Sequence, residues 1–184
     1  MTMEYNTGKF GYGWLMGVTS TILLSQKQTI TSQNTSVNTI SKIYSNVTFP
    51  YGSVILDYGC GKYDTAINHM ASVGCAVLPY DKYNRPEDVN ERSLNSAFDY
   101  IVCSNVLNVL ESEELIHSVL SHIQSLMNGS SVLYVSVYEG DRSGCGKETS
   151  KGFQQNQKSE WYKRLLENYF KTESLKNKIF RCTL

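Results

Sequence analysis

The chain has 184 residues, a formal net charge of zero and an ordinary apolar content of 41%. A chain of this length builds one domain with at most a short extension, and it needs no disulfide or structural metal to form a core. Zero net charge excludes the strong basic excess that is typical of dedicated nucleic-acid-binding domains. Basic residues do outnumber acids between Lys147 and Arg181. A solvated helix face explains this excess, and an anion-contacting surface is the alternative.

The five cysteines form no Cys-x-x-Cys pair, which argues against a zinc ribbon, and their odd number argues against a disulfide framework. Reduced thiols indicate a cytoplasmic protein. The three histidines show no metal-ligand spacing, so we predict no metal site. The apolar stretch 14–24 is interrupted by polar residues and is too short to cross a bilayer. It also lacks the features of a signal peptide, so we expect no membrane association.

Residues 1–52 differ from the rest of the chain because they are rich in Ser, Thr, Asn and Gln. Apolar residues at helical spacing predict a helix over 37–44, and Pro50 and Gly52 predict a turn after it. We therefore divide the chain into an N-terminal extension, 1–52, and a core, 53–184.

In the core, short apolar runs alternate with amphipathic stretches. The apolar runs predict strands at 54–56, 75–78, 98–103 and 132–137, and the amphipathic stretches predict helices at 62–73, 112–128 and 160–170. Residues 84–96 are polar and predict a loop, and the tail 174–183 suits one last strand. This alternation predicts a three-layer α/β sandwich with a mostly parallel central sheet. The interval between Asp81 and Phe98 is too short for a full helix and strand, so we expect a shortened sheet.

The segment Asp57-Tyr58-Gly59-Cys60-Gly61 follows the first strand and opens the first helix. Its glycines allow a tight turn and close approach of the backbone to a ligand. A dinucleotide loop needs a third glycine, but Asp64 stands there, and Asp57 would repel a pyrophosphate. An acid at this place suits a cation, such as the amino group of a methionine moiety. Charge therefore favours S-adenosylmethionine over NAD.

The segment resembles the first motif of class I S-adenosylmethionine-dependent methyltransferases, in which an apolar strand ends in Asp/Glu-x-Gly-x-Gly. Asp81 stands where that family has an acid for the ribose hydroxyls, and 98–107 and 132–137 resemble its fourth and fifth strands. The resemblance covers about 53–138 and implies a Rossmann-like fold with S-adenosylmethionine as cofactor.

The resemblance implies a cofactor site built from the ends of three strands. Lys82 and Tyr83 would flank the adenine, Asn90 would reach its edge, and Ser104 and Asn105 would contact the methionine part. The implied cofactor-binding residues are Asp57, Tyr58, Gly59, Cys60, Gly61, Asp81, Lys82, Tyr83, Asn90, Ser104, Asn105 and Val106. The two acids are also explained as a turn acid and a strand-end cap, and Asn105 as a helix cap.

The loop 138–149 holds two acids before its first arginine, a tyrosine and three glycines. Its place after a strand makes Tyr138, Glu139 and Asp141 candidates for a catalytic base or orienting group. A solvated connector is the alternative. The loop also looks similar to small, phage-type methyltransferase-like proteins.

We therefore expect methyl transfer to an unidentified acceptor. The N-terminal extension is expected to fold over the site as a substrate-side cap, which favours a small molecule and leaves nucleic acid open. Residues 104–107 lack the Asn/Asp-Pro-Pro-Tyr/Phe signature of amino-methylating DNA enzymes, and there is no Pro-Cys nucleophile. The alternatives are an enzyme that consumes S-adenosylmethionine in a lyase-like reaction and a non-catalytic, inhibitory interaction protein.

Overall fold

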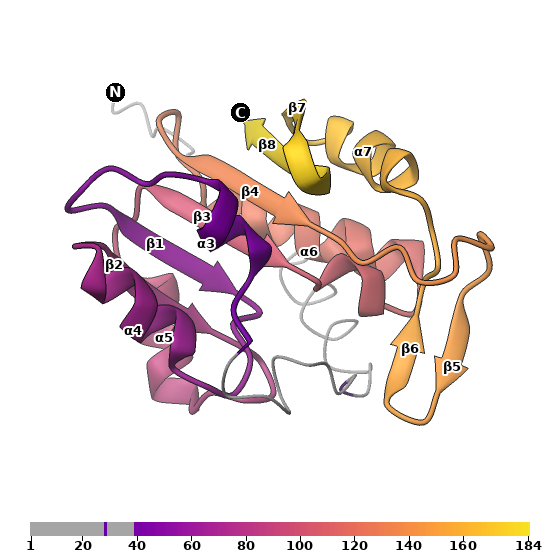
Figure 1. The fold of residues 1–184 in the computed structure, drawn as a ribbon, viewed down its shortest axis with the longest axis horizontal. Helices are drawn as coiled ribbons and strands as arrows, with labels where there is room; N and C mark the ends of the chain where they lie inside the picture. The colour runs from indigo at the N-terminus through magenta and orange to yellow at the C-terminus, as the bar shows by residue number, and fades with distance from the viewer. Residues whose placement is uncertain (1–27, 29–38) are drawn as a thin grey trace, which may run out of the picture.

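The computed structural model describes Gln28 and residues 39–184, so the expectations for 1–27 and 29–38 lie outside the described residues. Its main feature is a six-stranded sheet in the order β2-β1-β3-β4-β8-β7 (Figure 1). The strands are β1 (Val54–Tyr58), β2 (Ala76–Tyr80), β3 (Tyr100–Ser104), β4 (Val132–Ser136), β7 (Lys171–Leu175) and β8 (Ile179–Thr183). Neighbours among β1 to β4 pair in parallel, and β8 pairs antiparallel with both β4 and β7. The mostly parallel sheet is confirmed.

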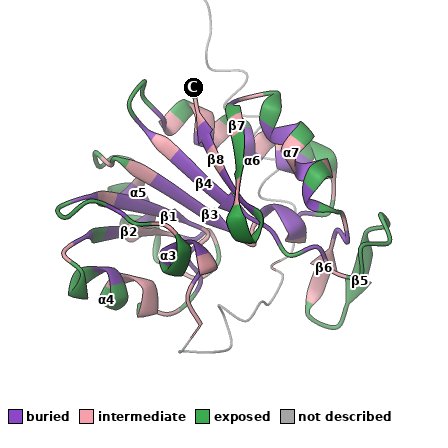
Figure 2. Cartoon of the chain, turned by 45° about the horizontal axis from the view of Figure 1, so that its top comes forward, coloured by how far each residue is buried: buried purple, intermediate pink, exposed green. Residues whose placement is uncertain are grey.

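Helices cover both faces of this sheet, which confirms the three-layer, Rossmann-like architecture. One apolar cluster joins α3 (Lys42–Asn46) and α4 (Thr65–Ser72) to the first face. A second cluster joins α6 (Glu113–Leu126) and α7 (Ser159–Glu167) to the other face, with Leu94 of α5 packed against it. Figure 2 shows the buried residues concentrated in the central strands between these layers. Because side chains alternate along a strand, β1 serves both clusters, with Ile55 in the first and Leu56 in the second.

Helix α6 forms as its sequence predicts. The Ser112 hydroxyl accepts a hydrogen bond from the Leu115 amide at 3.3 Å, and two glutamates occupy the first turn. Side-chain capping and acids near the N-terminus both stabilise a helix start. The apolar stripe is buried against the sheet from Leu115 to Ile123.

The prediction of a loop over 84–96 is wrong, because this segment contains the helix α5 (Glu87–Leu94). Pro86 precedes the helix, and Glu87 and Asp88 lie in its first turn. The helix lacks an apolar stripe because the residues it buries are polar, Asn90 and Ser93. The Ser93 hydroxyl donates to the Pro79 carbonyl oxygen at 2.7 Å, so hydrogen bonds replace the apolar contacts that periodicity detects. No strand accompanies α5 within residues 81–99, so β2 is an edge strand and the sheet is shortened as expected.

The last strand predicted from the tail is instead a pair, β7 and β8, joined by the 3-10 turn η2 (Lys176–Lys178). β7 is an edge strand with largely exposed side chains, so its sequence carries no apolar alternation. A second departure is the small hairpin of β5 (Lys147–Thr149) and β6 (Gly152–Gln154), which extends away from the sheet in Figure 1. No helix among the described residues has the length and apolarity needed to cross a membrane.

Candidate functional site

The candidate site begins at the carboxyl end of β1, where Asp57 is 2% exposed. Strand alternation puts its side chain on the α3 face, next to Tyr44 of that helix. Among the described residues, neither Asp57 Oδ1 nor the Tyr44 hydroxyl has a hydrogen-bond partner of normal geometry. Buried polar atoms without a regular hydrogen bond are uncommon, and these two lie close together at the edge of the sheet where α/β proteins bind ligands.

Burial raises the pKa of Asp57 to about 7. The Tyr44 hydroxyl and the Arg85 guanidinium oppose this shift, and the Asp81 carboxylate adds to it. Removing a carboxylate from water disfavours its charged form unless a donor or cation compensates. A cationic ligand group would supply that compensation, so the environment of Asp57 fits the amino group of a methionine moiety.

The glycine turn after β1 leads the chain directly across the neighbouring strand ends. Gly59 has φ +83°, and its amide and that of Cys60 donate to the Tyr80 carbonyl oxygen at 2.7 and 3.1 Å. A Cβ atom at Gly59 would lie 2.3 Å from Cγ2 of Val106, so the turn after β3 packs against the bare backbone. The close approach explains why glycine is required here.

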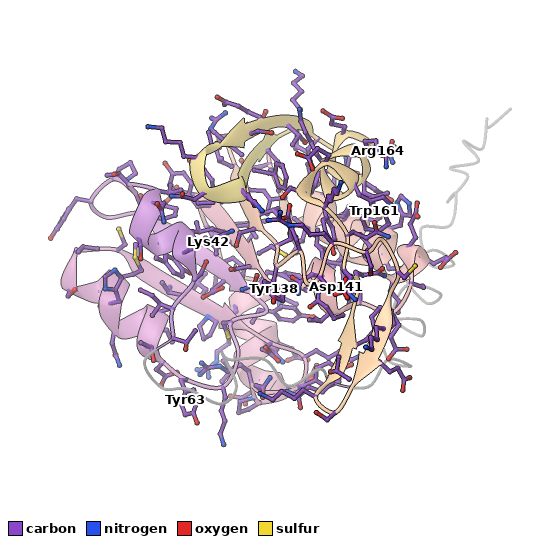
Figure 3. The ribbon with its side chains drawn as sticks, turned by 45° about the vertical axis from the view of Figure 1, so that its right-hand side comes forward. Lys42, Tyr63, Tyr138, Asp141, Trp161 and Arg164 are labelled. Atoms are coloured by element: carbon purple, nitrogen blue, oxygen red, sulfur yellow. The ribbon has the colours of Figure 1, made fainter. Side chains whose placement is uncertain are left out.

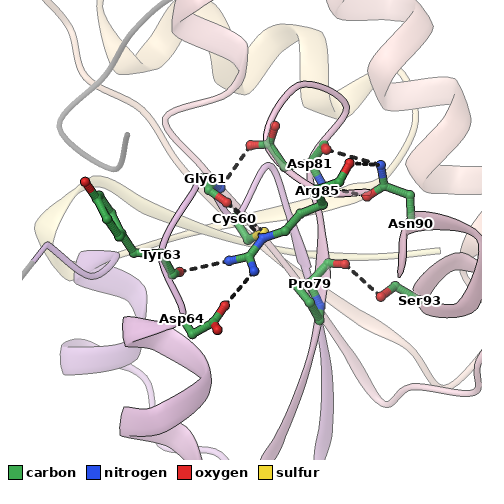
Figure 4. A network of polar contacts seen from close by, with 9 residues as sticks. All are labelled: Cys60, Gly61, Tyr63, Asp64, Pro79, Asp81, Arg85, Asn90 and Ser93. Atoms are coloured by element: carbon green, nitrogen blue, oxygen red, sulfur yellow. Dashed lines mark hydrogen bonds and ion pairs between the residues drawn. The ribbon is translucent and has the colours of Figure 1, made fainter. Parts of the chain in front are cut away.

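Asp81, at the end of β2, ties the two loops together (Figure 4). Its Oδ2 accepts from the Gly61 amide at 2.9 Å. Its Oδ1 accepts from the amides of Tyr83 and Asn84 at 2.9 and 3.0 Å, and from Asn84 Nδ2 at 2.8 Å. Three donors share Oδ1 and one contacts Oδ2, so among the described residues Oδ2 keeps one acceptor position, and two ribose hydroxyls would have to displace at least one donor. Gln28, from the N-terminal segment, donates to Asn84 Oδ1 at 3.0 Å and so reaches this edge.

Arg85 is a site residue that the sequence analysis missed. Its Nε and Nη2 donate to the carbonyl oxygens of Gly61 and Tyr63 at 3.0 and 2.9 Å, and its Nη1 pairs with Asp64 at 2.5 Å (Figure 4). One planar guanidinium thus holds three successive parts of the glycine loop. No sequence signal marked it, because it lies at the start of the stretch interpreted as a loop.

The other residues predicted on this side have different surroundings. Asn90 is buried, and its side chain brackets the Asp81 backbone, accepting from its amide at 3.0 Å and donating to its carbonyl at 3.2 Å. The Lys82 ammonium is buried without a hydrogen-bond partner among the described residues and lies 4.8 Å from the Tyr83 ring centre. Tyr83 is 44% exposed. Lys82 and Tyr83 thus follow Asp81 at this edge of the sheet, whereas Asn90 supports the Asp81 backbone.

Two predicted cofactor contacts point their side chains elsewhere. Tyr58 faces the α6 side of the sheet, where its hydroxyl and His122 Nδ1 are 2.8 Å apart and its ring packs on Tyr80. The Cys60 thiol donates to the Gly61 carbonyl oxygen, and burial raises its pKa to about 12, so it stays protonated. Both residues offer a ligand their backbone atoms rather than their side chains.

At the end of β3, Ser104 and Asn105 are both anchored to β4. The hydroxyls of Ser104 and Ser136 are 2.8 Å apart and buried. Asn105 has φ +57°, and its amide donates to the Ser136 carbonyl oxygen at 2.8 Å. A left-handed residue at this point turns the chain sharply, which brings Val106 against Gly59. The structure therefore brings the first and third strand ends together, as predicted.

The three catalytic candidates do not converge. The Tyr138 side chain is 62% exposed, while Asp141 is exposed and accepts from the Ser143 amide at 2.9 Å (Figure 3). Glu139 is buried: its Oε1 accepts from the Ser159 amide and hydroxyl at 2.8 and 2.5 Å.

Glu139 Oε2 pairs with Arg142 at 2.7 Å and with Lys178. Burial opposes ionisation of Glu139, but the hydrogen bonds from Lys178 and Ser159 outweigh it and hold the pKa at about 2. A carboxylate with so low a pKa is a weak base at neutral pH. These contacts favour a structural function for Glu139, at the start of α7.

Comparison with protein families decides the assignment. A family model described as "Methyltransferase domain" matches residues 37–178, most of the chain. The chain belongs to this methyltransferase family. It is an enzyme of the class I, S-adenosylmethionine-dependent superfamily, and S-adenosylmethionine is its cofactor. A search of curated protein sequences finds no match.

Solved structures with the same fold are distant in sequence. The 1,6-didemethyltoxoflavin-N1-methyltransferase of Burkholderia thailandensis is 17% identical, with TM-score 0.52 over 72% of this chain and 70% of that one. A methyltransferase from Methanosarcina mazei is 14% identical, with TM-score 0.52 and coverages of 79% and 98%. A protein from Pyrococcus horikoshii is 13% identical, with TM-score 0.53 and coverages of 83% and 94%. Similarity to these structures at such low sequence identity shows that the methyltransferase has the same fold.

Proposed function

We propose that this methyltransferase binds S-adenosylmethionine across the carboxyl ends of β1, β2 and β3 and methylates a small-molecule acceptor. The observation that carries the proposal is Asp57, a buried carboxyl group beside a glycine turn, whose Oδ1 has no hydrogen bond of normal geometry with any described residue. In this proposal Asp57 receives the cofactor's amino group. The absence of side chains at Gly59 and Gly61 lets the cofactor approach the backbone. Asp81 binds the ribose hydroxyls, which replace some of the hydrogen bonds that its carboxylate accepts in the free protein.

The remaining contacts follow from position along the strand ends. Lys82 and Tyr83 lie beside Asp81 and would flank the adenine. Ser104, Asn105 and Val106 lie across from Gly59 and would line the methionine part. Tyr58 and Cys60 contribute backbone only, because their side chains are engaged elsewhere.

The bound sulfonium supplies an electrophilic methyl group. The chain has then to align a nucleophilic atom with it and to exclude water. Glu139 is an ion-paired carboxylate of low pKa and Asp141 is exposed, so we propose that no dedicated carboxylate base is needed. Tyr138 stays as the candidate for orienting the acceptor, because its exposed ring follows β4 at the same edge.

Two observations support an enclosed, small acceptor. Gln28 contacts Asn84, so part of the N-terminal segment reaches the cofactor edge, as the proposed substrate-side cap 1–52 requires. The Burkholderia enzyme of the same fold was solved with the small molecule 1,6-didemethyltoxoflavin bound. All five cysteines are free thiols, which supports a cytoplasmic location.

The test is calorimetric titration with S-adenosylhomocysteine, the demethylated form of the cofactor. We expect binding by the wild type and at least about a tenfold loss in Asp57→Ala and Asp81→Ala, because each variant removes a charged hydrogen-bonding partner. Asp88→Ala is the matched control, since Asp88 pairs with Arg92 on the exposed surface of α5. A folded wild type that does not bind, or variants that bind as tightly as it does, would overturn the proposed site.

A further inference from the structure

Three segments that are far apart in sequence meet beyond the carboxyl end of β4. They are α3, the connection between β4 and β5, and the turn η2. The Asn177 side chain donates to Asn46 Oδ1, which ties η2 to α3. Glu139 pairs with Arg142 and Lys178, which ties the connection to η2. Lys42 lies one turn before Asn46 on α3, and its carbonyl oxygen accepts from Asn46 Nδ2 at 2.7 Å.

These segments bring three cations around one carboxylate. Glu139 Oε1 is taken by Ser159, so Arg142 and Lys178 share Oε2. Lys42 makes no ion pair with any described residue. Burial and the nearby Lys178 ammonium lower the pKa of Lys42, and the Glu139 carboxylate opposes this shift. The cluster of Lys42, Arg142 and Lys178 therefore keeps a positive excess after Glu139 is neutralised. One carboxylate offsets only part of the mutual repulsion of three cations, so this arrangement favours the binding of an anion.

The geometry of Arg142 leaves a binding group available. It contacts Glu139 through Nε, while its two terminal nitrogens make no hydrogen bond with other described residues. Two terminal N–H groups of a guanidinium match the two oxygens of a carboxylate or phosphate. Its side chain is 58% exposed, so a ligand has access.

The backbone holds the cluster in an unusual conformation. Arg142 has φ +60° and Lys178 has φ +56°, a region that side-chain-bearing residues other than Asn rarely adopt. The two cationic partners of Glu139 thus both have left-handed backbone conformations. Strain of this kind collects where a side chain must point in a set direction.

We propose that Lys42, Arg142 and Lys178 form a subsite for an oxyanion carried by the methyl acceptor, either a carboxylate or a phosphate. Arg142 belongs to the same connection after β4 as the exposed Tyr138, so the subsite lies past the carboxyl end of that strand. This inference rests on the proposed function, and it narrows the acceptor from any small molecule to an acidic one.

The experiment is an NMR titration of the ¹⁵N-labelled full chain, saturated with S-adenosylhomocysteine, with inorganic phosphate and separately with acetate. Sodium chloride keeps the ionic strength constant. We expect saturable amide shifts at Lys42, Arg142 and Lys178 with at least one of the two anions. The better-bound anion identifies the oxyanion as phosphate or carboxylate.

Two variants and one control make the test specific. Lys42→Gln and Arg142→Gln should each weaken anion binding by about fivefold or more, as loss of a charge-assisted hydrogen bond requires. Lys163→Gln should leave it unchanged, because Lys163 pairs with Glu167 on α7. Shifts that neither saturate nor respond to the two variants would overturn the subsite. Calorimetry with S-adenosylhomocysteine on the same samples reports separately on the proposed function, so the two failures are distinguishable.

Discussion

The guanidinium group of Arg85 holds the glycine loop through Gly61, with 3.0 Å between its Nε and the Gly61 carbonyl oxygen. This hydrogen bond fixes the direction of the Gly61 carbonyl group. The conformation of the glycine loop after β1 therefore depends on Arg85, a residue that follows β2. The positive charge of Arg85 also lowers the pKa of Asp57. One side chain therefore acts on both the geometry and the charge of the proposed cofactor site.

Arg85→Gln should weaken S-adenosylhomocysteine binding at pH 7 by about tenfold, since three hydrogen bonds from one cation are lost. The loss should also raise the pKa of Asp57, so the pH below which affinity falls should move upward. Calorimetry across pH 5.5 to 8.5, the range around about pH 7, measures both effects. Arg92→Gln, in an exposed pair with Asp88, is the matched control. Unchanged affinity and an unchanged pH profile in Arg85→Gln would contradict this function.

The sequence predicted the strands and the loop from Asp57 to Gly61 because both follow simple rules. Parallel strands are continuous apolar runs, and their carboxyl ends meet at one edge. Arg85 was not predicted as a site residue because it lies just before α5, a helix that the sequence did not reveal. The residues that α5 buries, Asn90 and Ser93, are polar, so the sequence of α5 lacks apolar periodicity. The partners of Glu139 come from segments separated by 20 and 39 positions, and only the tertiary fold brings Ser159 and Lys178 to it.

Affinity for S-adenosylhomocysteine should fall as the pH drops below about 7, the pKa of Asp57 in the unliganded protein. Only the charged carboxylate attracts the ligand's amino group, so protonation competes with binding. The dissociation constant should rise about tenfold for each pH unit below that value. Asp57→Asn should bind weakly with no such dependence between pH 5 and 7. A wild-type affinity that is flat over the same range would contradict the link between Asp57 and the amino group.

Asp57 should also make the free energy of unfolding fall as the pH rises, whereas an acid whose pKa is lowered by folding has the opposite effect. The folded pKa of about 7 is higher than the ordinary carboxyl value of 3.8, so between these two values the folded state holds a proton that the unfolded chain releases. The contribution of neutral Asp57 is full below about pH 4 and is lost as the pH rises through about 7. Asp57→Asn should therefore match the wild type at pH 4 and exceed it at pH 8.5 by up to about 4 kcal/mol. Urea unfolding at both pH values tests this, and an equal difference at both would contradict it.

Gly59→Ala should lower stability more than Gly52→Ala, although both glycines have φ near +84°. The shared backbone cost is about 1 kcal/mol. At Gly52 the new Cβ meets nothing within 4 Å, whereas at Gly59 it would lie 2.3 Å from Val106 Cγ2. Such overlap adds about 1 to 3 kcal/mol. In the Gly59→Ala/Val106→Ala double variant the overlap should disappear and the backbone cost should remain, because Val106 Cβ lies 3.7 Å from the new methyl group. Equal unfolding free energies for Gly52→Ala and Gly59→Ala would show that the turn can move away from Val106.

Glu139→Gln should separate a structural function from a catalytic one. The folded pKa of about 2 lies below the ordinary value of 4.5, so ionised Glu139 stabilises the fold above about pH 4.5, and this contribution is lost as the pH falls toward 2. At pH 7 the variant should lose about 1 to 2 kcal/mol, a modest figure because Arg142 and Lys178 are half exposed. The difference should shrink near pH 2.5. Glu160→Gln, in the first turn of α7, is the control. A Glu139→Gln variant with unchanged unfolding and lost methyl transfer would instead support Glu139 as the catalytic base.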